Sequence, residues 1–255
     1  MNTSISYWYF TPAITPEQCN QIIDLGEKKL KSYKKDGLRT EATTFGKNSK
    51  QDKTDASSQK DLSTEEIKKI GLDKNNLYVR DSEVAWLCDD WLYDLVNNLM
   101  RQANQYAGWN FDIDCFEDFQ FTKYNAPGGF YGWHQDCAGD WYSRYKRYIP
   151  GITHEGVMKK NEQYPDRHTL QENYINKVRK VSMTLNLSPE NSYEGGNLKF
   201  DFGPHTSGER YKVCEEIRPQ GSMVVFPSYE YHCVTPVTQG TRYSLVLWAL
   251  GAPFK

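Results

Sequence analysis

The sequence predicts a mainly β protein of the α+β class, an antiparallel β-sandwich or barrel with helices packed against one sheet. Two helical patterns precede residue 115, and beyond it the chain breaks into short segments bounded by turn residues. Aromatic residues make up 14% of the chain, which favours a β-rich protein with a lined cavity. We expect one domain over residues 1–255, with a helical part at 1–115 and a β core at 116–249. The predicted strands are 116–124, 129–134, 180–187, 197–202, 222–226 and 241–249.

The first predicted helix begins after Thr15. Thr15 is a suitable N-cap, Pro16 suits the first helical position, and Gln18 can complete a capping box. Apolar residues then recur at helical spacing, namely Cys19, Ile22, Ile23 and Leu30. Residues from about 33 to 61 are rich in Lys, Thr, Ser, Asp and Gln, and this composition predicts a polar loop.

The second predicted helix has an apolar face that repeats every three to four residues. This face comprises Leu87, Trp91, Leu92, Leu95, Leu99 and Ala103. A helix with one apolar face must bury it, so we expect this helix to pack on a sheet.

Composition narrows the function classes. The net charge of −2 gives no broad basic field, so no nucleic-acid partner is implied. No apolar run approaches the roughly 20 residues that span a bilayer, and the N-terminus lacks a signal-peptide pattern, so we expect a soluble, intracellular (cytoplasmic) protein. The six cysteines form no C-x-x-C pair, which disfavours structural zinc and, in a reducing compartment, disulfides. Oligomeric state is left open.

The tripeptide His134-Gln135-Asp136 is the first half of a candidate metal site. Residues i and i+2 of a strand point to one face, so His134 and Asp136 can ligate one ion. A lone H-x-D triplet is weak evidence, but His232 follows a turn in a β-type segment and offers a third ligand. Two histidines and one carboxylate are the ligand set of non-haem Fe(II) oxygenases, which keep open positions for reactants. The other histidines lie in loop-like sequence and are expected at the surface: His154, His168 and His205.

Arg242 lies ten residues beyond His232, in an apolar strand. An unpaired buried guanidinium is costly, so a carboxylate partner is expected. The planar fork of arginine matches a carboxylate, so Arg242 could hold the distal end of a dicarboxylate co-substrate. A structural salt bridge with one of the chain's own acids is the alternative.

Three blocks in a fixed order carry a family resemblance, namely Tyr124 to Asp136, Ser188 to Leu198 and His232 to Arg242. Over about residues 116–248 the chain resembles the 2-oxoglutarate and Fe(II)-dependent dioxygenases. It is most similar to the prolyl 4-hydroxylase superfamily, in its bacterial and phage branch. The resemblance implies a double-stranded β-helix, or jelly-roll, with N-terminal helices against one sheet. It assigns His134, Asp136 and His232 to Fe(II), and Arg242 to the C5 carboxylate of 2-oxoglutarate.

Further co-substrate residues follow from the resemblance and from alternation. Tyr124 matches a family tyrosine that lines the pocket, although a packed core tyrosine is equally consistent. Thr184 and Asn186 alternate along a predicted strand and could face the interior to hold 2-oxoglutarate, although relatives often place Tyr or Phe near Asn186. Gly195-Gly196 is expected at a turn or bulge with positive φ or close backbone approach. Trp248 is expected in the core.

The expected reaction is hydroxylation of an aliphatic C–H bond, with ascorbate as the reductant. The family favours a peptide or protein substrate and a peptidyl proline. Aromatic residues near the mouth could stack on a proline ring: Tyr131, Trp133, Trp141 and Tyr142. A long insertion at about 137–177 is either a lid over the substrate or a surface excursion. Three alternatives remain: a small-molecule or other side-chain substrate, a zinc hydrolase, and a non-enzymatic jelly-roll that binds carbohydrate or peptide.

Overall fold

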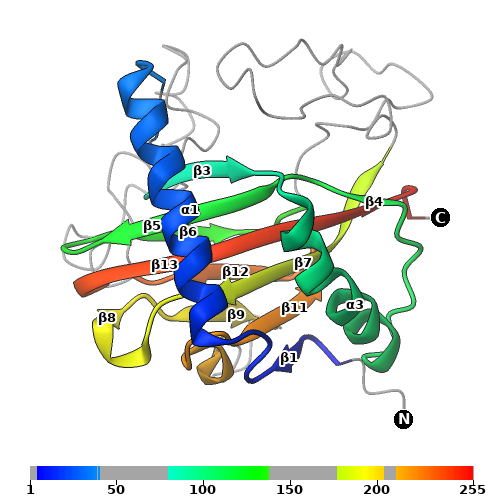
Figure 1. Cartoon of the computed structure of the whole chain (residues 1–255). Helices are drawn as coiled ribbons and strands as arrows, with labels where there is room; N and C mark the ends of the chain where they lie inside the picture. The colour runs from blue at the N-terminus through cyan, green and yellow to red at the C-terminus, as the bar shows by residue number, and fades with distance from the viewer. Residues whose placement is uncertain (1–4, 39, 41–79, 138–176, 204–210, 255) are drawn as a thin grey trace, which may run out of the picture.

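The computed structural model describes residues 5–38, 40, 80–137, 177–203 and 211–254, which form two helices and two antiparallel sheets (Figure 1). Across the eight-stranded sheet the order is β1 (Trp8–Phe10), β11 (Met223–Pro227), β7 (Val178–Asn186), β13 (Val237–Gly251), β5 (Phe119–Asn125) and β3 (Glu83–Leu87). Strands β4 (Cys115–Phe116) and β8 (Tyr193–Gly195) also pair with β13. The five-stranded sheet has the order β10 (Tyr211–Val213), β9 (Leu198–Asp201), β12 (Tyr231–Val234), β6 (Phe130–His134) and β2 (Arg80–Asp81).

The chain alternates between the two sheets from β5 onward. Strands β5, β7, β11 and β13 belong to the larger sheet, whereas the intervening β6, β9 and β12 belong to the smaller one. This crossing between layers is the arrangement of a double-stranded β-helix, and it confirms the predicted fold class. Short 3₁₀ turns, η3 (Glu190–Ser192) and η4 (Glu215–Ile217), lie in the connections after β7 and β10.

Helix α1 (Pro16–Lys35) has the predicted capping box. The Gln18 amide donates to Thr15 Oγ1 at 3.2 Å, and the Thr15 amide donates to Gln18 Oε1 at 2.9 Å. The prediction of a polar loop from residue 33 is wrong at its start, because the helix continues through Lys35 and Tyr33 is buried one turn after Leu30. The rest of that segment, apart from residues 36–38 and 40, lies outside the described residues.

Helix α3 (Asp90–Tyr106) begins later than predicted. Leu87 does not belong to it, because this residue ends strand β3, where it pairs with Phe119 and is buried. The buried helical face is Leu92, Val96, Met100 and Ala103, and the predicted Trp91 is exposed. Two acidic residues, Asp89 and Asp90, interrupt the apolar pattern and mark the true helix start.

Both helices cover the outer face of the eight-stranded sheet, as expected (Figure 1). Their buried residues form one core with side chains of β5, β7 and β13, including Phe121, Met183 and Leu247. The approach is close at Gly26, where an added Cβ would lie 2.4 Å from the Phe121 ring. Glycine at this position therefore lets α1 lie directly on the sheet.

All six predicted strands occur, with ends shifted by a few residues. The sequence analysis missed the five-residue β3, whose last residue, Leu87, was assigned to the following helix. It also missed strands of two or three residues, which are too short to show an alternating period: β1, β2, β4, β8 and β10. Within the described part of the chain, neither helix is long and apolar enough to cross a membrane.

Candidate metal centre

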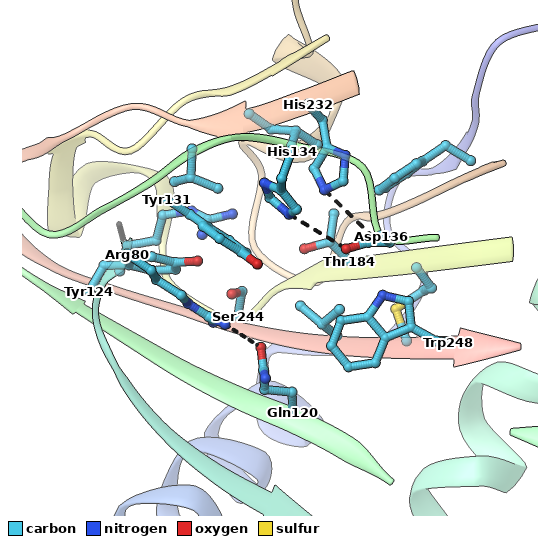
Figure 2. A pocket seen from close by; sticks show the side chains of 16 residues that line it. Arg80, Gln120, Tyr124, Tyr131, His134, Asp136, Thr184, His232, Ser244 and Trp248 are labelled. Carbon is cyan, nitrogen blue, oxygen red and sulfur yellow. Dashed lines mark hydrogen bonds and ion pairs between the residues drawn. The ribbon is translucent and has the colours of Figure 1, made fainter. Parts of the chain in front are cut away.

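A pocket of about 420 Å³ lies between the two sheets. The larger sheet lines it with side chains of β5, β7, β11 and β13, and the smaller sheet with side chains of β2, β6, β9 and β12. Figure 2 shows Tyr124 and Arg80 at one end of the pocket, Trp248 at the other, and a His/Asp/His group between them.

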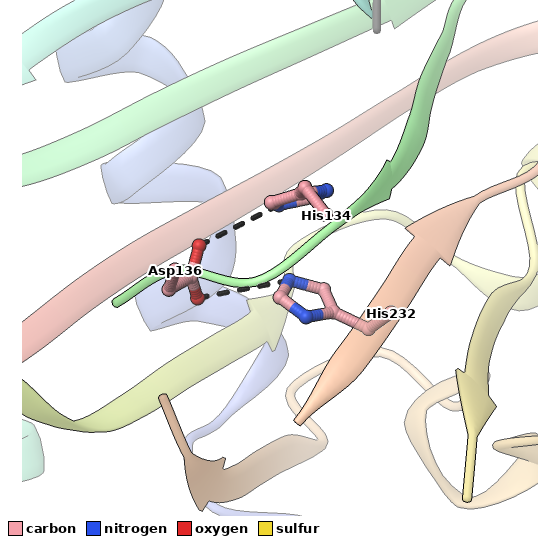
Figure 3. Close-up of side chains that lie close together, drawn as sticks. All are labelled: His134, Asp136 and His232. Carbon is pink, nitrogen blue, oxygen red and sulfur yellow. Dashed lines mark ion pairs between the residues drawn. The ribbon is translucent and has the colours of Figure 1, made fainter. Parts of the chain in front are cut away.

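The three predicted metal ligands converge in this pocket. His134 ends β6, Asp136 lies two residues beyond it, and His232 on β12 pairs in register with His134. Their ligand atoms all lie within 4.8 Å of one another. Both imidazoles turn Nε2 toward the same carboxylate, at 3.5 Å from His134 to Oδ1 and 3.6 Å from His232 to Oδ2 of Asp136 (Figure 3).

The backbone fixes the tautomer of each imidazole. Nδ1 of His134 lies 2.7 Å from the carbonyl oxygen of Gly132, and Nδ1 of His232 lies 2.9 Å from that of Glu230. A carbonyl oxygen only accepts, so each Nδ1 carries the proton and donates it. Each Nε2 then keeps its lone pair for a metal ion. Histidines that bind metal ions in other proteins likewise donate their second ring N–H to a nearby oxygen.

Electrostatics keep the ligands in their metal-binding protonation states. Burial, reinforced by the neighbouring His134, lowers the pKa of His232 to about 4, so its imidazole is neutral near pH 7. Burial alone raises the pKa of Asp136, but His232, His134 and Arg179 outweigh it and hold this pKa well below its usual range. A neutral imidazole and an ionised carboxylate are the forms that bind metal.

An ion pair next to Asp136 fixes the backbone at this residue. Arg179 on β7 donates to the Asp136 carbonyl oxygen at 3.4 Å and binds the buried Glu117 carboxylate through two contacts of 2.5 and 2.7 Å. The same guanidinium lies 3.8 Å from the ring centre of Trp248. Asp136 is therefore held by a rigid group although it lies beyond the strand end.

Arg242 lies at the opposite end of the pocket from Trp248, on β13. It is 1% exposed, pairs in register with Tyr124, and its guanidinium lies 5.5 Å from the centre of that ring. Its Nη1 has no acceptor among the described residues, and none of their acids pairs with it. The structural salt bridge considered from the sequence is thus absent from this part of the chain, and a buried donor is left for a ligand.

The double glycine makes room for Arg242. Gly195 and Gly196 have φ of +72° and +59°, which confirms the expected left-handed backbone. A Cβ on Gly196 would lie 2.9 Å from Cδ of Arg242, and one on Gly195 would lie 2.1 Å from the Pro236 carbonyl oxygen. The motif therefore lets the chain pass directly beside the arginine stem.

The remaining predicted residues divide between the pocket and other places. Tyr124, Thr184 and Tyr131 line the pocket. Asn186 does not, because its amide donates to the carbonyl oxygens of Ser188 and Arg218 and serves the loop after β7. Trp133 lies outside the lining, against the exposed Tyr211. Trp141, Tyr142, His154, His168, His205 and the proposed lid, apart from Cys137 and Lys177, lie outside the described residues.

Sequence reasoning missed Arg80, which also lines the pocket. Its guanidinium donates to Ser82, Gln120 and Thr122 at 2.7, 2.7 and 2.8 Å, and lies 4.5 Å from the centre of the Tyr131 ring. Tyr131 in turn stacks on His134, with centroids 3.6 Å apart. The sequence carried little signal for Arg80, because the polar Asp81 and Ser82 follow it directly and strand β2 is only two residues long.

Trp248 is buried, as expected of a core residue, and it also lines the pocket, which sequence reasoning did not predict. It is 5% exposed, and its Nε1 has no acceptor among the described residues. Alternation along β13 puts it on the same face as Arg242, and this was the signal that could have found it.

The chain belongs to the 2OG-Fe(II) oxygenase superfamily, whose family model matches residues 119–250. This family implies Fe(II) and 2-oxoglutarate. The residues fit both groups: two neutral imidazoles and one carboxylate suit Fe(II), and an unsatisfied buried guanidinium suits a carboxylate.

Curated relatives match over a shorter segment. The chain is 46% identical over 72 residues to a PKHD-type hydroxylase of Hyphomonas neptunium, covering 28% of this chain and 29% of that protein. It is 43% identical over 70 residues to a PKHD-type hydroxylase of Escherichia coli, covering 27% of each. The matched segment thus spans less than a third of the length of these relatives.

Solved structures share the fold over nearly the whole chain at low identity. A viral collagen prolyl hydroxylase from Paramecium Bursaria Chlorella virus-1 has a TM-score of 0.51 at 15% identity and covers 97% of each chain. A Pseudomonas putida prolyl-4-hydroxylase has a TM-score of 0.51 at 16% identity, with 96% of this chain and 91% of that one covered. A Trichoplax adhaerens prolyl hydroxylase, solved with a peptide, has a TM-score of 0.55 at 14% identity and covers 97% and 84%. These likenesses support the double-stranded β-helix.

Proposed function

We propose that this protein is an Fe(II)- and 2-oxoglutarate-dependent dioxygenase that hydroxylates an aliphatic C–H bond. The observation that carries the proposal is the unsatisfied guanidinium of Arg242 in the same pocket as His134, Asp136 and His232. When bound, the metal and its co-substrate would use O₂, one oxygen atom of which enters succinate as 2-oxoglutarate loses CO₂ while the other enters the C–H bond as a hydroxyl group.

The chain's own residues bind and orient the reactants. His134, Asp136 and His232 hold Fe(II) through two nitrogen atoms and one carboxylate. Arg242 holds the distal carboxylate of 2-oxoglutarate, with Tyr124 beside it and Thr184 also in the pocket lining. Three protein ligands leave the other metal positions to small molecules, which is the requirement for oxygenase chemistry.

The protein also keeps bulk water from the reacting atoms. His232 and Arg242 are 6% and 1% exposed, and apolar Phe226, Val234 and Val246 line the pocket around them. This shielding would protect the reacting atoms from solvent when the metal and its co-substrate are bound.

For the substrate, we propose a peptidyl proline. PKHD-type hydroxylases and prolyl hydroxylases are the relatives and structural neighbours, and one of these was solved with a peptide bound. Two aromatic residues of the pocket suit a pyrrolidine ring, namely Tyr131 and Trp248. The same proposal includes Trp141 and Tyr142, which follow Asp136 in the sequence, as further aromatic residues that stack on the substrate.

The test is turnover of 2-oxoglutarate with Fe(II) and with ascorbate as the proposed reductant. Succinate is followed by NMR, and proline-rich peptides are screened by mass spectrometry for the gain of one oxygen atom. We expect slow succinate formation without peptide and faster formation with an accepted peptide.

The matched control is His134→Ala, which removes one metal ligand. This variant is expected to form no succinate above the metal-free background, while its circular dichroism spectrum is unchanged. If the wild type neither binds nor turns over 2-oxoglutarate, the dioxygenase proposal fails. If the Zn(II)-loaded protein instead hydrolysed a substrate in the absence of O₂, the result would favour a metal hydrolase.

A further inference from the structure

Two buried hydrogen-bond donors in the pocket lack acceptors among the described residues. One is Nη1 of Arg242, which the proposed function assigns to 2-oxoglutarate, and the other is Nε1 of Trp248. An indole nitrogen only donates, so it is left unsatisfied unless a ligand or water brings an acceptor oxygen. The proposed function so far uses only the aromatic ring of Trp248, as a surface for a proline ring, and gives its N–H no role.

The two residues that carry these donors are well separated along β13. Arg242 and Trp248 lie on the same face of the strand, six residues apart, which corresponds to about 20 Å between their Cα atoms. 2-Oxoglutarate is a five-carbon diacid and is much shorter than this. We therefore assign the two donors to different ligands.

The metal ligands lie between the two donors. Figure 2 shows His134, Asp136 and His232 between the Tyr124 end, where Arg242 pairs, and the Trp248 end. The register of β13 and β7 places the pocket residues Val246 and Thr184 opposite each other, two pairs before Trp248 and Ser182. A co-substrate that runs from Arg242 to the metal leaves Trp248 on the far side, where the substrate to be hydroxylated enters.

The indole is held in one position before any ligand binds. The Arg179 guanidinium lies 3.8 Å from its ring centre and is itself fixed by the buried Glu117 carboxylate. Trp86 contacts the ring at a tilt, with centroids 6.3 Å apart. A rigid donor in a shielded site loses little entropy when it meets an acceptor.

We propose that the indole N–H of Trp248 donates a hydrogen bond to a carbonyl oxygen of the substrate. The substrate class is therefore one that carries a neutral carbonyl next to the carbon to be hydroxylated, as every residue of a peptide does. Trp248 thus both stacks on the substrate ring and fixes the substrate's orientation toward the metal. This inference rests on the proposed function, because the order of binding along β13 starts from 2-oxoglutarate at Arg242.

The first test follows the indole directly by NMR. The protein is labelled with ¹⁵N in its tryptophan indoles and loaded with Zn(II), which is diamagnetic, and the Trp248 signal is assigned by its loss in Trp248→Phe. We expect little change with 2-oxoglutarate, and then a downfield N–H shift when an acetylated, amidated proline-rich peptide is added. A shift caused by 2-oxoglutarate alone overturns the assignment to the substrate.

The second test measures affinity with the Mn(II)-loaded protein by calorimetry. Trp248→Phe keeps an aromatic ring and loses only the donor, so we expect an unchanged Kd for 2-oxoglutarate and about tenfold weaker peptide binding, the scale of one lost buried hydrogen bond. Trp91→Phe is the matched control, since it alters an exposed indole of α3 that does not line the pocket, and it should leave both affinities within twofold.

The outcomes separate this inference from the proposed function. Equal peptide affinity for wild type and Trp248→Phe, with no N–H shift, overturns the role of Trp248 and leaves the dioxygenase intact. If 2-oxoglutarate does not bind at all, the proposed function itself fails. If 2-oxoglutarate binds but no proline-rich peptide does, the peptide carbonyl is overturned as the acceptor, and the proposed peptidyl substrate fails with it.

Discussion

The metal end and the arginine end of the pocket call for ligands of opposite charge. At the metal end, His134 and His232 donate from Nδ1 to backbone carbonyl oxygens and turn the Nε2 lone pairs toward the Asp136 carboxylate. At the other end, Arg242 is 1% exposed and keeps an Nη1 donor without an acceptor among the described residues. The first end presents acceptors to its centre and suits a cation, whereas the second presents a donor and suits an anion.

This difference predicts different effects of mutation at the two ends. Removing Asp136 removes the negative charge that attracts a metal ion, so metal-dependent function should decline. Removing the unsatisfied cation of Arg242 relieves a cost of burial, so the affinity for a carboxylate should decline without loss of stability. The two ends can therefore be distinguished by measuring thermal stability, metal affinity and co-substrate affinity on the same variants.

The largest effect is expected for Asp136→Ala at the metal end. The variant loses the only carboxylate of the cluster and leaves two neutral imidazoles, so Fe(II)-dependent succinate formation should fall by about a thousandfold or more. Calorimetry with Mn(II) and the NMR assay for succinate provide the measurements. Asp94→Ala removes an exposed acid of α3 and is the control. Retention of a tenth of the activity would show that Asp136 is not a ligand.

A smaller loss is expected for Arg242→Gln at the arginine end. The Kd for 2-oxoglutarate should rise by about a hundredfold, because a charge-assisted bidentate contact is lost. The melting temperature without co-substrate should not fall, because the buried charge is removed. Arg101→Gln, on the exposed face of α3, is the control. A clear drop in melting temperature would mean that Arg242 has a structural partner and would remove the contrast between the two ends.

Alternation along strands was enough to predict most of the site from sequence. His134 and Asp136 are two residues apart, and the cation of Arg242 is conspicuous in an apolar strand, so all three could be chosen locally. Arg80 could not, because its partners Gln120 and Thr122 are 40 and 42 residues away and its strand is too short to show a period. The unsatisfied N–H of Trp248 could not be predicted either, since the packing around a donor decides whether it meets an acceptor.

The same limit applies to the prediction of helices, strands and pocket residues. Leu87 fits the helical period of the following residues, yet it pairs with Phe119 in the sheet, because a strand partner distant in sequence decides its conformation. Asn186 fits the alternation of pocket residues, yet its side-chain amide donates to the carbonyl oxygens of Ser188 and Arg218 instead. In both cases a long-range or loop contact overrides a correct local period.

A moderate effect is expected for Gly196→Ala, which acts on the arginine end indirectly. The new Cβ would lie 2.9 Å from Cδ of Arg242, and the residue has φ of +59°, so the arginine stem must shift. We expect about tenfold weaker binding of 2-oxoglutarate and a loss of about 1–2 kcal/mol in stability. Gly108→Ala is the matched control, since φ is +78° there and no atom lies within 4 Å. An equal loss of affinity in both variants would exclude the contact with Arg242 as the cause.

The smallest effect is expected for Thr15→Ala, which lies outside the pocket. The substitution removes one half of the capping box of α1, so the free energy of unfolding should fall by about 1 kcal/mol. The Kd for 2-oxoglutarate should stay unchanged, because α1 packs on the outer face of the sheet and contributes no pocket residue. Urea denaturation and calorimetry check the two values, with the exposed Thr238→Ala as control. A weaker co-substrate affinity here would mean that global stability alone alters the arginine end, and the loss in Gly196→Ala could then no longer be assigned to its contact with Arg242.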